Sequence, residues 1–184
     1  MNIVLDVGNT YIKVGAFEGE ELLWSQSFSE MADVVLKIEA LQPTYILISS
    51  VRSDDALHTL SRVSKVFYVS SQTRLPIDIV YKTPNTLGSV WIAAAVGSTV
   101  LFPKQNNLVF DIGTCLTHGI IDSDQKYYGG SISPGVEMRF KSLAHFTQKL
   151  PLLEVPESLV EITGKSTAES IYSGILNGMQ FEIE

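Results

Sequence analysis

One stretch near the start decides the fold: Ile3-Val4-Leu5-Asp6-Val7-Gly8-Asn9-Thr10-Tyr11-Ile12-Lys13-Val14-Gly15. It predicts an apolar strand, a tight polar turn and a second strand. Gly8 and Asn9 are the residues that most readily take positive φ or a turn conformation. Such a turn directs backbone N–H groups and the Thr10 hydroxyl into one concavity, which suits a phosphate, and Asp6 can hold a phosphate-bound cation. On this stretch alone, an ordinary hairpin is an equal alternative.

The same pattern returns in the second half of the chain. Leu108-Val109-Phe110-Asp111-Ile112-Gly113-Thr114 aligns Asp111 with Asp6 and Gly113 with Gly8. An acidic turn and a further strand follow each copy. Because internal repeats indicate repeated structural units, the chain is predicted to form two similar lobes. We expect an N-terminal lobe over residues 1–105 and a C-terminal lobe over residues 106–184.

Hydrophobic periodicity predicts an α/β protein whose first lobe has the order β-β-β-α-β-α-β. Ser29 is the expected N-cap of its first helix, and Pro134 is expected in the first turn of a later helix. Ser166-Thr167-Ala168-Glu169 reads as a capping box that starts the last helix. The remaining elements are predicted as strands at 22–28, 45–50, 65–69, 77–81 and 127–132, and helices at 29–41, 54–63 and 87–101.

Composition narrows the class of protein. The formal net charge is −7, from 13 basic and 20 acidic residues, and no basic run is present. The chain therefore lacks the footprint of a nucleic-acid binder. Cys115 is the only cysteine, so no internal disulfide can form. We find no signal-peptide pattern and no apolar run long enough to span a membrane, and we expect a cytoplasmic protein.

A few single residues can be interpreted either as ordinary structural residues or as functional residues. Cys115 beside the second turn is expected to be a small buried apolar residue. Lys13 can reach a phosphate or simply be solvated. Arg139 and Lys141 are expected on a solvated helix face, with a dimer or ligand contact as the alternative. No metal-ligand spacing is found among the histidines, which are His58, His118 and His145.

Two lobes that each open with an Asp-x-Gly-[Asn/Thr] hairpin resemble the actin/hexokinase/acetate-kinase superfamily. The closer resemblance is to the type III pantothenate kinases, and six motifs carry it in order across nearly the whole chain. They are Asp6-Val7-Gly8-Asn9-Thr10, Tyr81-x-x-Pro84-x-x-Leu87-Gly88, Asp111-Ile112-Gly113-Thr114, Gly129-Gly130-x-Ile132-x-Pro134-Gly135, Leu143-x-x-x-Thr147-x-x-Leu150-Pro151 and Thr167-x-x-Ser170-Ile171-x-Ser173-Gly174-Ile175.

The resemblance implies two ribonuclease-H-like lobes with mixed sheets and flanking helices, and ATP-dependent phosphorylation of pantothenate, the first step towards coenzyme A. It also implies a homodimer with the pocket near the subunit interface. Cofactors would be Mg²⁺ and a monovalent cation, K⁺ or NH₄⁺, with Asp111 and Asp6 as metal ligands. Gly129, Gly130, Pro134 and Gly135 would lie near the nucleotide. The implied ATP contacts are Asp6, Val7, Gly8, Asn9, Thr10, Tyr11, Ile12, Lys13, Gly113 and Thr114, and the implied acceptor pocket is Tyr81, Gly88, Ser89, Val90, Trp91 and Thr167.

The chain departs from this family at positions that matter for chemistry. Relatives carry Asp-Arg where this chain has Val90 and Trp91, the Asp being the proposed base on the pantothenate hydroxyl and the Arg a substrate contact. A positioned base is worth roughly 10²–10⁴ in rate. Gly119 also stands where relatives often carry Asp, and the second lobe is expected to be incomplete at its C-terminus. The alternative function is therefore a catalytically impaired relative with a nucleotide-binding or regulatory role.

Overall fold

The computed structural model describes residues 1–52, 56–158 and 160–184, and the chain divides into two compact units. The first comprises Met1–Val109 and Gly119–Gly129, and the second Phe110–His118 and Gly130–Glu184. The expected boundary between residues 105 and 106 differs from this division. Three long strands each run from one unit into the other, so the chain crosses the division several times.

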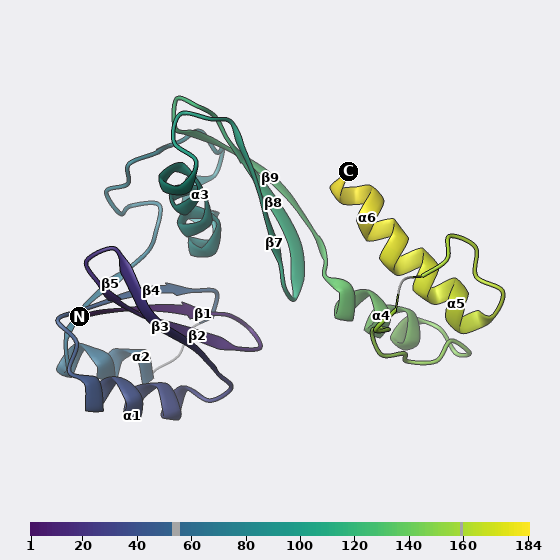
Figure 1. Ribbon diagram of the computed structural model, residues 1–184, viewed down its shortest axis with the longest axis horizontal. Coiled ribbons are helices and arrows are strands. Elements are labelled where there is room, and N and C mark those ends of the chain that lie inside the picture. Colours follow the sequence, from purple (N-terminus) through teal and green to yellow (C-terminus); the bar gives the residue numbers. More distant parts are fainter. Residues whose placement is uncertain (53–55, 159) are drawn as a thin grey trace. The chain divides into compact units, whose positions relative to one another are not determined.

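The first unit contains a five-stranded sheet (Figure 1). Strand order is β3-β2-β1-β4-β5, with β1 antiparallel to β2 and parallel to β4. This order, with helices after β3 and β4, confirms the predicted β-β-β-α-β-α-β succession and the ribonuclease-H-like lobe. The strands are β1 (Asn2–Val7), β2 (Ile12–Glu18), β3 (Glu21–Phe28), β4 (Tyr45–Ser50) and β5 (Lys65–Tyr68).

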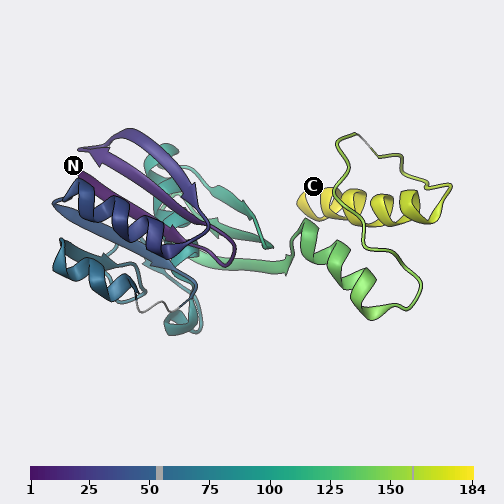
Figure 2. The ribbon, with the colours of Figure 1, turned by 90° about the horizontal axis from the view of Figure 1, so that it is seen from below.

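One face of this sheet forms the larger core. Alternate residues of β1 are fully buried, as period-two patterning requires. Helix α1 (Met31–Leu41), helix α2 (Ala56–Thr59) and the 3₁₀ turn η1 (Leu60–Arg62) lie together along that face (Figures 1 and 2). Each fully buried aliphatic side chain contributes roughly 1.5–3 kcal/mol relative to an exposed one. The cluster includes Ile3, Leu5, Val7, Ile12, Val14, Val34, Ile38, Ile46, Ile48 and Leu60.

Several predicted helix starts are wrong by a few residues. The N-cap of α1 is Glu30 rather than Ser29, and its side chain makes no capping hydrogen bond. The buried Met31 determines the start of α1 through packing instead. The predicted helix 54–63 contains only the short α2 and η1, and residues 54 and 55 lie outside the described residues. Helix α3 begins at Ser89 rather than near Leu87, after the 3₁₀ turn η2 (Pro84–Thr86).

A second sheet has the order β6-β9-β8-β7. Its strands are β6 (Asp78–Ile79), β7 (Asn107–Ile112), β8 (Cys115–Ile121) and β9 (Lys126–Pro134). Tight turns join β7 to β8 and β8 to β9, which requires antiparallel neighbours, whereas β6 runs parallel to β9. Within the first unit, α3 (Ser89–Leu101) packs on this sheet through Ala95, Ile121 and Tyr127.

The second unit is built on α4 (Val136–Phe146) and a C-terminal helical run (Figure 1). That run comprises α5 (Thr167–Tyr172), the π-helical turn η3 (Ser173–Asn177) and α6 (Gly178–Ile183). Its buried residues Ile171, Ile175 and Met179 pack with Phe140 and Leu116. Pro134 ends β9 and Gly135 is the N-cap of α4, so the prediction of Pro134 in the first helical turn is wrong.

The predicted capping box is confirmed. Ser166 Oγ accepts a hydrogen bond from the Glu169 backbone N–H at 3.2 Å. The Glu169 carboxylate reaches back to the Lys165 backbone N–H, one residue before the usual partner, at 2.6 Å.

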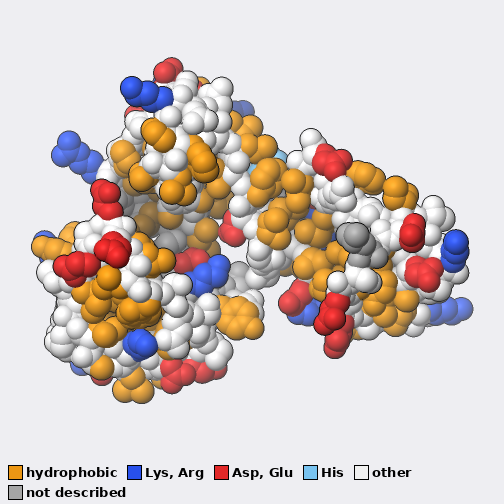
Figure 3. Space-filling view, viewed as in Figure 1, with side chains coloured by type: hydrophobic (Ala, Val, Ile, Leu, Met, Phe, Trp, Pro, Cys, Tyr) orange, Lys and Arg blue, Asp and Glu red, His pale blue; other side chains and the backbone are white. Residues whose placement is uncertain are grey.

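Lysine and arginine side chains are scattered rather than gathered into a patch on the face shown in Figure 3. Within residues 1–52, 56–158 and 160–184, none of the helices is long and apolar enough to cross a membrane.

Candidate active site

The first hairpin closes as a tight turn between β1 and β2. The Gly8 backbone N–H donates to the Tyr11 carbonyl at 3.0 Å, and neither Gly8 nor Asn9 has positive φ. Asn9, Thr10 and Tyr11 are exposed, so their polar groups are accessible to a ligand. Val7 and Ile12, predicted as ATP contacts, have fully buried side chains, which leaves only their backbone groups for a ligand.

Asp6 and Lys13 face each other across this hairpin. They are register partners on β1 and β2, and Lys13 Nζ lies 3.9 Å from Asp6 Oδ2. Both side chains are on the sheet face opposite the core, where Lys13 is exposed and Asp6 half-buried. The hairpin therefore presents one carboxylate and one ammonium group on the strand residues that flank the turn.

Ser89 fixes the start of α3 next to this hairpin. Its Oγ accepts from the Ser50 backbone N–H at 3.0 Å and donates to the Ser50 carbonyl at 3.1 Å. Ser49 Oγ donates to Ser89 Oγ at 3.0 Å. Since Ser49 and Ser50 are the register partners of Asp6 and Val7, the Gly88-Ser89 motif lies at the carboxyl ends of β1 and β4. In α/β sheets this edge is the usual place for ligands.

Tyr127 packs against Trp91, one of the residues predicted to line the acceptor pocket. The Trp91 ring meets the Tyr127 ring edge-on, with centroids 6.4 Å apart. The Tyr81 ring lies against Gly129, whose φ is +102° and where an added Cβ would be 2.8 Å from two ring carbons. Trp91 is thus half-buried against the core around Tyr127, while Val90 beside it is also half-buried. Trp91 therefore packs on Tyr127, and Tyr81 packs on Gly129.

Tyr127 also makes the fold sensitive to alkali. Burial, and then the nearby Tyr81, raises the pKa of Tyr127 from 10.0 to about 12. Between these values the folded chain keeps a proton that the unfolded chain has lost, so the free energy of unfolding should fall as pH rises from about 10 to about 12. Denaturant unfolding at about pH 8 and about pH 11 measures this.

Tyr127→Phe should remove much of that pH dependence. It should not destabilise the chain at about pH 8, because among the described residues the Tyr127 hydroxyl is buried without a hydrogen-bond partner. Tyr11→Phe, at an exposed tyrosine, is the control. An unchanged alkaline profile in Tyr127→Phe would contradict the assignment.

The second hairpin repeats the first. Asp111 is the last residue but one of β7, as Asp6 is of β1, and the Gly113 backbone N–H donates back to the Cys115 carbonyl at 2.9 Å. Asp111, Gly113 and Thr114 are exposed. Cys115 is only half-buried, so its predicted burial is incomplete.

The segment Ser133-Pro134-Gly135 backs this second turn. The Gly135 backbone N–H donates to the Thr114 carbonyl at 3.0 Å. A Cβ at Gly135 would lie 2.2 Å from the Gly113 carbonyl oxygen and 2.6 Å from that of Thr114. Only glycine allows this approach, so the turn and the segment behind it form one unit of structure.

Arg139 is not on a solvated face, and that expectation is wrong. Its side chain is 20% exposed and its guanidinium bonds to the 133–134 segment and to Glu182. Lys141 does follow the expectation, since it is 66% exposed and pairs with Glu137 at 2.9 Å. The Arg139–Glu182 pair joins residues far apart in the chain, and no sequence pattern marks it.

Thr167 belongs to the second unit and lines a cavity of about 990 Å³. The walls combine hydroxyl groups with apolar side chains and include Arg139, Ser142, Leu143, Leu150, Lys165, Ser166, Ser170, Ile171 and Ile175. The other predicted acceptor residues, from Tyr81 to Trp91, belong to the first unit.

The carboxylates of Asp6 and Asp111 are suited to bind a cation that also contacts phosphate oxygens. Across the described part of the chain, no three His, Cys, Asp or Glu side chains gather closely enough to form a metal cage. Mg²⁺ at phosphate sites needs only one or two carboxylates, with phosphate oxygens and waters completing the shell. The accessible Asp6 and Asp111, each at the end of a strand before a glycine turn, fit that requirement.

Comparisons with known proteins identify the family of this chain. A family model described as type III pantothenate kinase matches residues 2–184. The type III pantothenate kinase of Cytophaga hutchinsonii is 57% identical over 184 residues, which cover 100% of this chain and 78% of the relative. That of Christiangramia forsetii is 39% identical over 191 residues, covering 100% and 78%.

Solved structures resemble this chain in fold. A Baf family protein from Campylobacter jejuni aligns with a TM-score of 0.64 at 15% identity, covering 98% of this chain and 77% of that one. The family model and these relatives identify the chain as a phosphotransferase, and its fold matches that of the solved structure. Within that class, the chain belongs to the type III pantothenate kinase family.

Proposed function

We propose that this chain transfers the γ-phosphoryl group of ATP to pantothenate. Membership of the type III pantothenate kinase family carries this proposal. In the reaction, the pantothenate hydroxyl oxygen forms a bond to the γ-phosphorus, the bond between that phosphorus and the β–γ bridging oxygen breaks, and ADP leaves. The hydroxyl proton passes to solvent or to a phosphate oxygen.

The two hairpins are proposed to hold the nucleotide. The exposed turns at Gly8–Tyr11 and Gly113–Thr114 offer amide and hydroxyl groups to phosphate oxygens. Asp6 and Asp111 would hold Mg²⁺ and a monovalent cation, K⁺ or NH₄⁺, which offset phosphate charge. Lys13, which pairs with Asp6, can exchange that partner for a phosphate oxygen.

Pantothenate is proposed to bind along the start of α3. Ser89 is bonded to Ser50 beside the first hairpin, and the rings of Tyr81 and Trp91 would each offer apolar surface to pantothenate. From the family resemblance, Thr167 is also proposed to contact pantothenate. We also propose, from the family resemblance, a cytoplasmic homodimer, which light scattering would test.

A second candidate is a relative that binds nucleotide with little turnover. Val90 cannot accept a proton, and Trp91 packs against Tyr127 rather than presenting a charge. Phosphoryl transfer depends mainly on positioning and electrostatics, however, so turnover does not require a base.

Pantothenate-dependent release of ADP, followed in a coupled assay with K⁺ and Mg²⁺, separates the two. We expect turnover that falls roughly 10²–10³-fold in Asp6→Asn, the cost of removing one preorganised electrostatic group. Asp33→Asn, at an exposed carboxylate on α1, should leave it unchanged. ATP binding without any pantothenate-dependent ADP release would favour the second candidate.

A further inference from the structure

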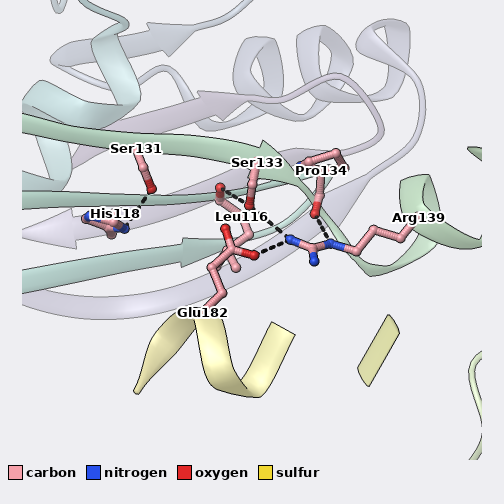
Figure 4. Close-up of polar contacts among 7 residues, drawn as sticks. All are labelled: Leu116, His118, Ser131, Ser133, Pro134, Arg139 and Glu182. Carbon is pink, nitrogen blue, oxygen red and sulfur yellow. Dashed lines mark hydrogen bonds and ion pairs between the residues drawn. The ribbon is translucent and has the colours of Figure 1, made fainter. Parts of the chain in front are cut away.

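Arg139 connects three parts of the second unit (Figure 4). Its Nε donates to the Pro134 carbonyl at 2.7 Å, and its Nη2 donates to Ser133 Oγ at 3.1 Å. The same Nη2 donates to the Glu182 carboxylate on α6. A planar guanidinium satisfies several acceptors in one fixed geometry, which an ammonium group does not.

The two acceptors at 133 and 134 belong to the segment that backs the second hairpin. The Gly135 N–H bond to the Thr114 carbonyl and the close approach of Gly135 to Gly113 join that segment to the turn. Ser133 Oγ lies 3.4 Å from the Leu116 carbonyl on β8, two residues beyond the turn. A shift of the segment would therefore shift the Gly113–Thr114 turn.

Glu182 accepts from the same guanidinium nitrogen that donates to Ser133. The hydrogen bond from Ser133, and then that from Arg139, holds the pKa of Glu182 below its usual range, so the carboxylate stays charged at neutral pH. Next to it, His118 Nδ1 lies 2.8 Å from Ser131 Oγ, and His118 further favours the charged carboxylate. The three groups bonded to Arg139 in Figure 4, from Pro134, Ser133 and Glu182, all act as acceptors.

We propose that Arg139 is a positioning residue for nucleotide binding. It holds Ser133-Pro134-Gly135 against the Gly113–Thr114 turn, and Glu182 holds Arg139 in the orientation that this requires. Arg139 acts through the segment rather than by touching ATP. The proposal rests on the proposed function only in assigning ATP and its cations to that turn.

The Lys141–Glu137 pair provides a matched control. It is an ion pair on the same helix, α4, at 2.9 Å, but both side chains are exposed and neither bonds to the 133–135 segment. Losing Lys141 therefore removes a charge and an ion pair from α4 without loosening the segment behind the turn. Exposed pairs of this kind contribute little to stability.

The test compares Arg139→Ala, Arg139→Lys, Glu182→Gln and Lys141→Ala with the unmodified chain, well below the unfolding temperature. Calorimetry gives the affinity for ATP with Mg²⁺ and K⁺, and hydrogen exchange gives the protection of the Gly113 and Gly135 amides. Arg139→Ala should weaken ATP binding roughly 10–100-fold, as loss of a supporting partner does at metal sites. It should also speed exchange at both amides.

The other variants are expected to lose less ATP affinity and less amide protection than Arg139→Ala. Glu182→Gln should have a smaller effect than Arg139→Ala, because Arg139 keeps its bonds to Pro134 and Ser133. Arg139→Lys should fall between the two, and Lys141→Ala should match the unmodified chain. Should Arg139→Ala fail to fold, Arg139→Lys and Glu182→Gln carry the same comparison.

Unchanged ATP affinity and unchanged exchange in Arg139→Ala would overturn the proposal, as would equal losses in Lys141→Ala. If the unmodified chain bound no ATP, the assignment of the turn to nucleotide would fail, and with it the proposed function. Exchange at Gly113 and Gly135 would still decide whether Arg139 holds the turn.

Discussion

Val90→Asp is expected to raise kcat for pantothenate phosphorylation by roughly 10²–10⁴-fold, the range that a positioned general base contributes. Position 90 is the second residue of α3, and Ser89 anchors this helix start at the carboxyl ends of β1 and β4. An aspartate there lies in the first helical turn, where the helix dipole favours a negative charge by about 0.3–1 kcal/mol. The steady-state kcat, with KM for pantothenate measured alongside, gives the result.

Val90→Asn is the matched control, because asparagine has nearly the same shape as aspartate but has no carboxylate to accept a proton. If Val90→Asp and Val90→Asn gave the same kcat, position 90 would not be the missing base. Trp91 is best left unchanged in this experiment. Its half-buried ring packs against Tyr127, and a loss of stability from removing this contact would obscure any catalytic gain.

Gly135→Ala is expected to disrupt the second hairpin. The added methyl group would lie 2.2 Å from the Gly113 carbonyl oxygen, and backbone atoms cannot move aside as a flexible side chain can. Overpacking of this kind typically costs about 1–3 kcal/mol or more in the free energy of unfolding. ATP affinity should fall in the same variant, since the Gly113–Thr114 turn is displaced. Denaturant unfolding and calorimetry measure the two effects.

Gly97→Ala gives the opposite expectation. Gly97 lies inside α3 with nothing within 4 Å of an added Cβ, so alanine should stabilise the chain by about 0.5–1 kcal/mol. If Gly135→Ala and Gly97→Ala changed the free energy of unfolding by the same amount, the close approach at Gly135 would not constrain the turn.

The strands and the repeat could be predicted because their signals are local. Each hairpin places an aspartate at the last residue but one of an apolar strand, followed by a glycine turn, and the sequence alone reveals this pattern. The capping box at Ser166 is equally local, since its partners lie three residues apart. The helix starts at Met31 and Ser89 are harder to predict, because neither N-cap side chain makes a capping bond. Packing of Met31 and hydrogen bonds from Ser89 to β4 determine them instead.

The surroundings of Arg139 could not be predicted. An arginine and a lysine two positions apart on a helix look alike in sequence, yet Arg139 is bonded to Pro134, Ser133 and Glu182 while Lys141 is exposed. Ser89 is similar, because its partners on β4 are forty positions away in the chain. Such contacts depend on how distant elements pack, and local periodicity carries no information about that.

We expect this chain to phosphorylate pantothenate. Mass spectrometry of the products formed from pantothenate, Mg²⁺, K⁺ and ATP labelled in the γ-phosphoryl group tests this activity. Labelled phosphopantothenate and unlabelled ADP should form in equal amounts, and neither should form without pantothenate. A folded chain that binds ATP and pantothenate but forms no labelled phosphopantothenate would contradict this expectation.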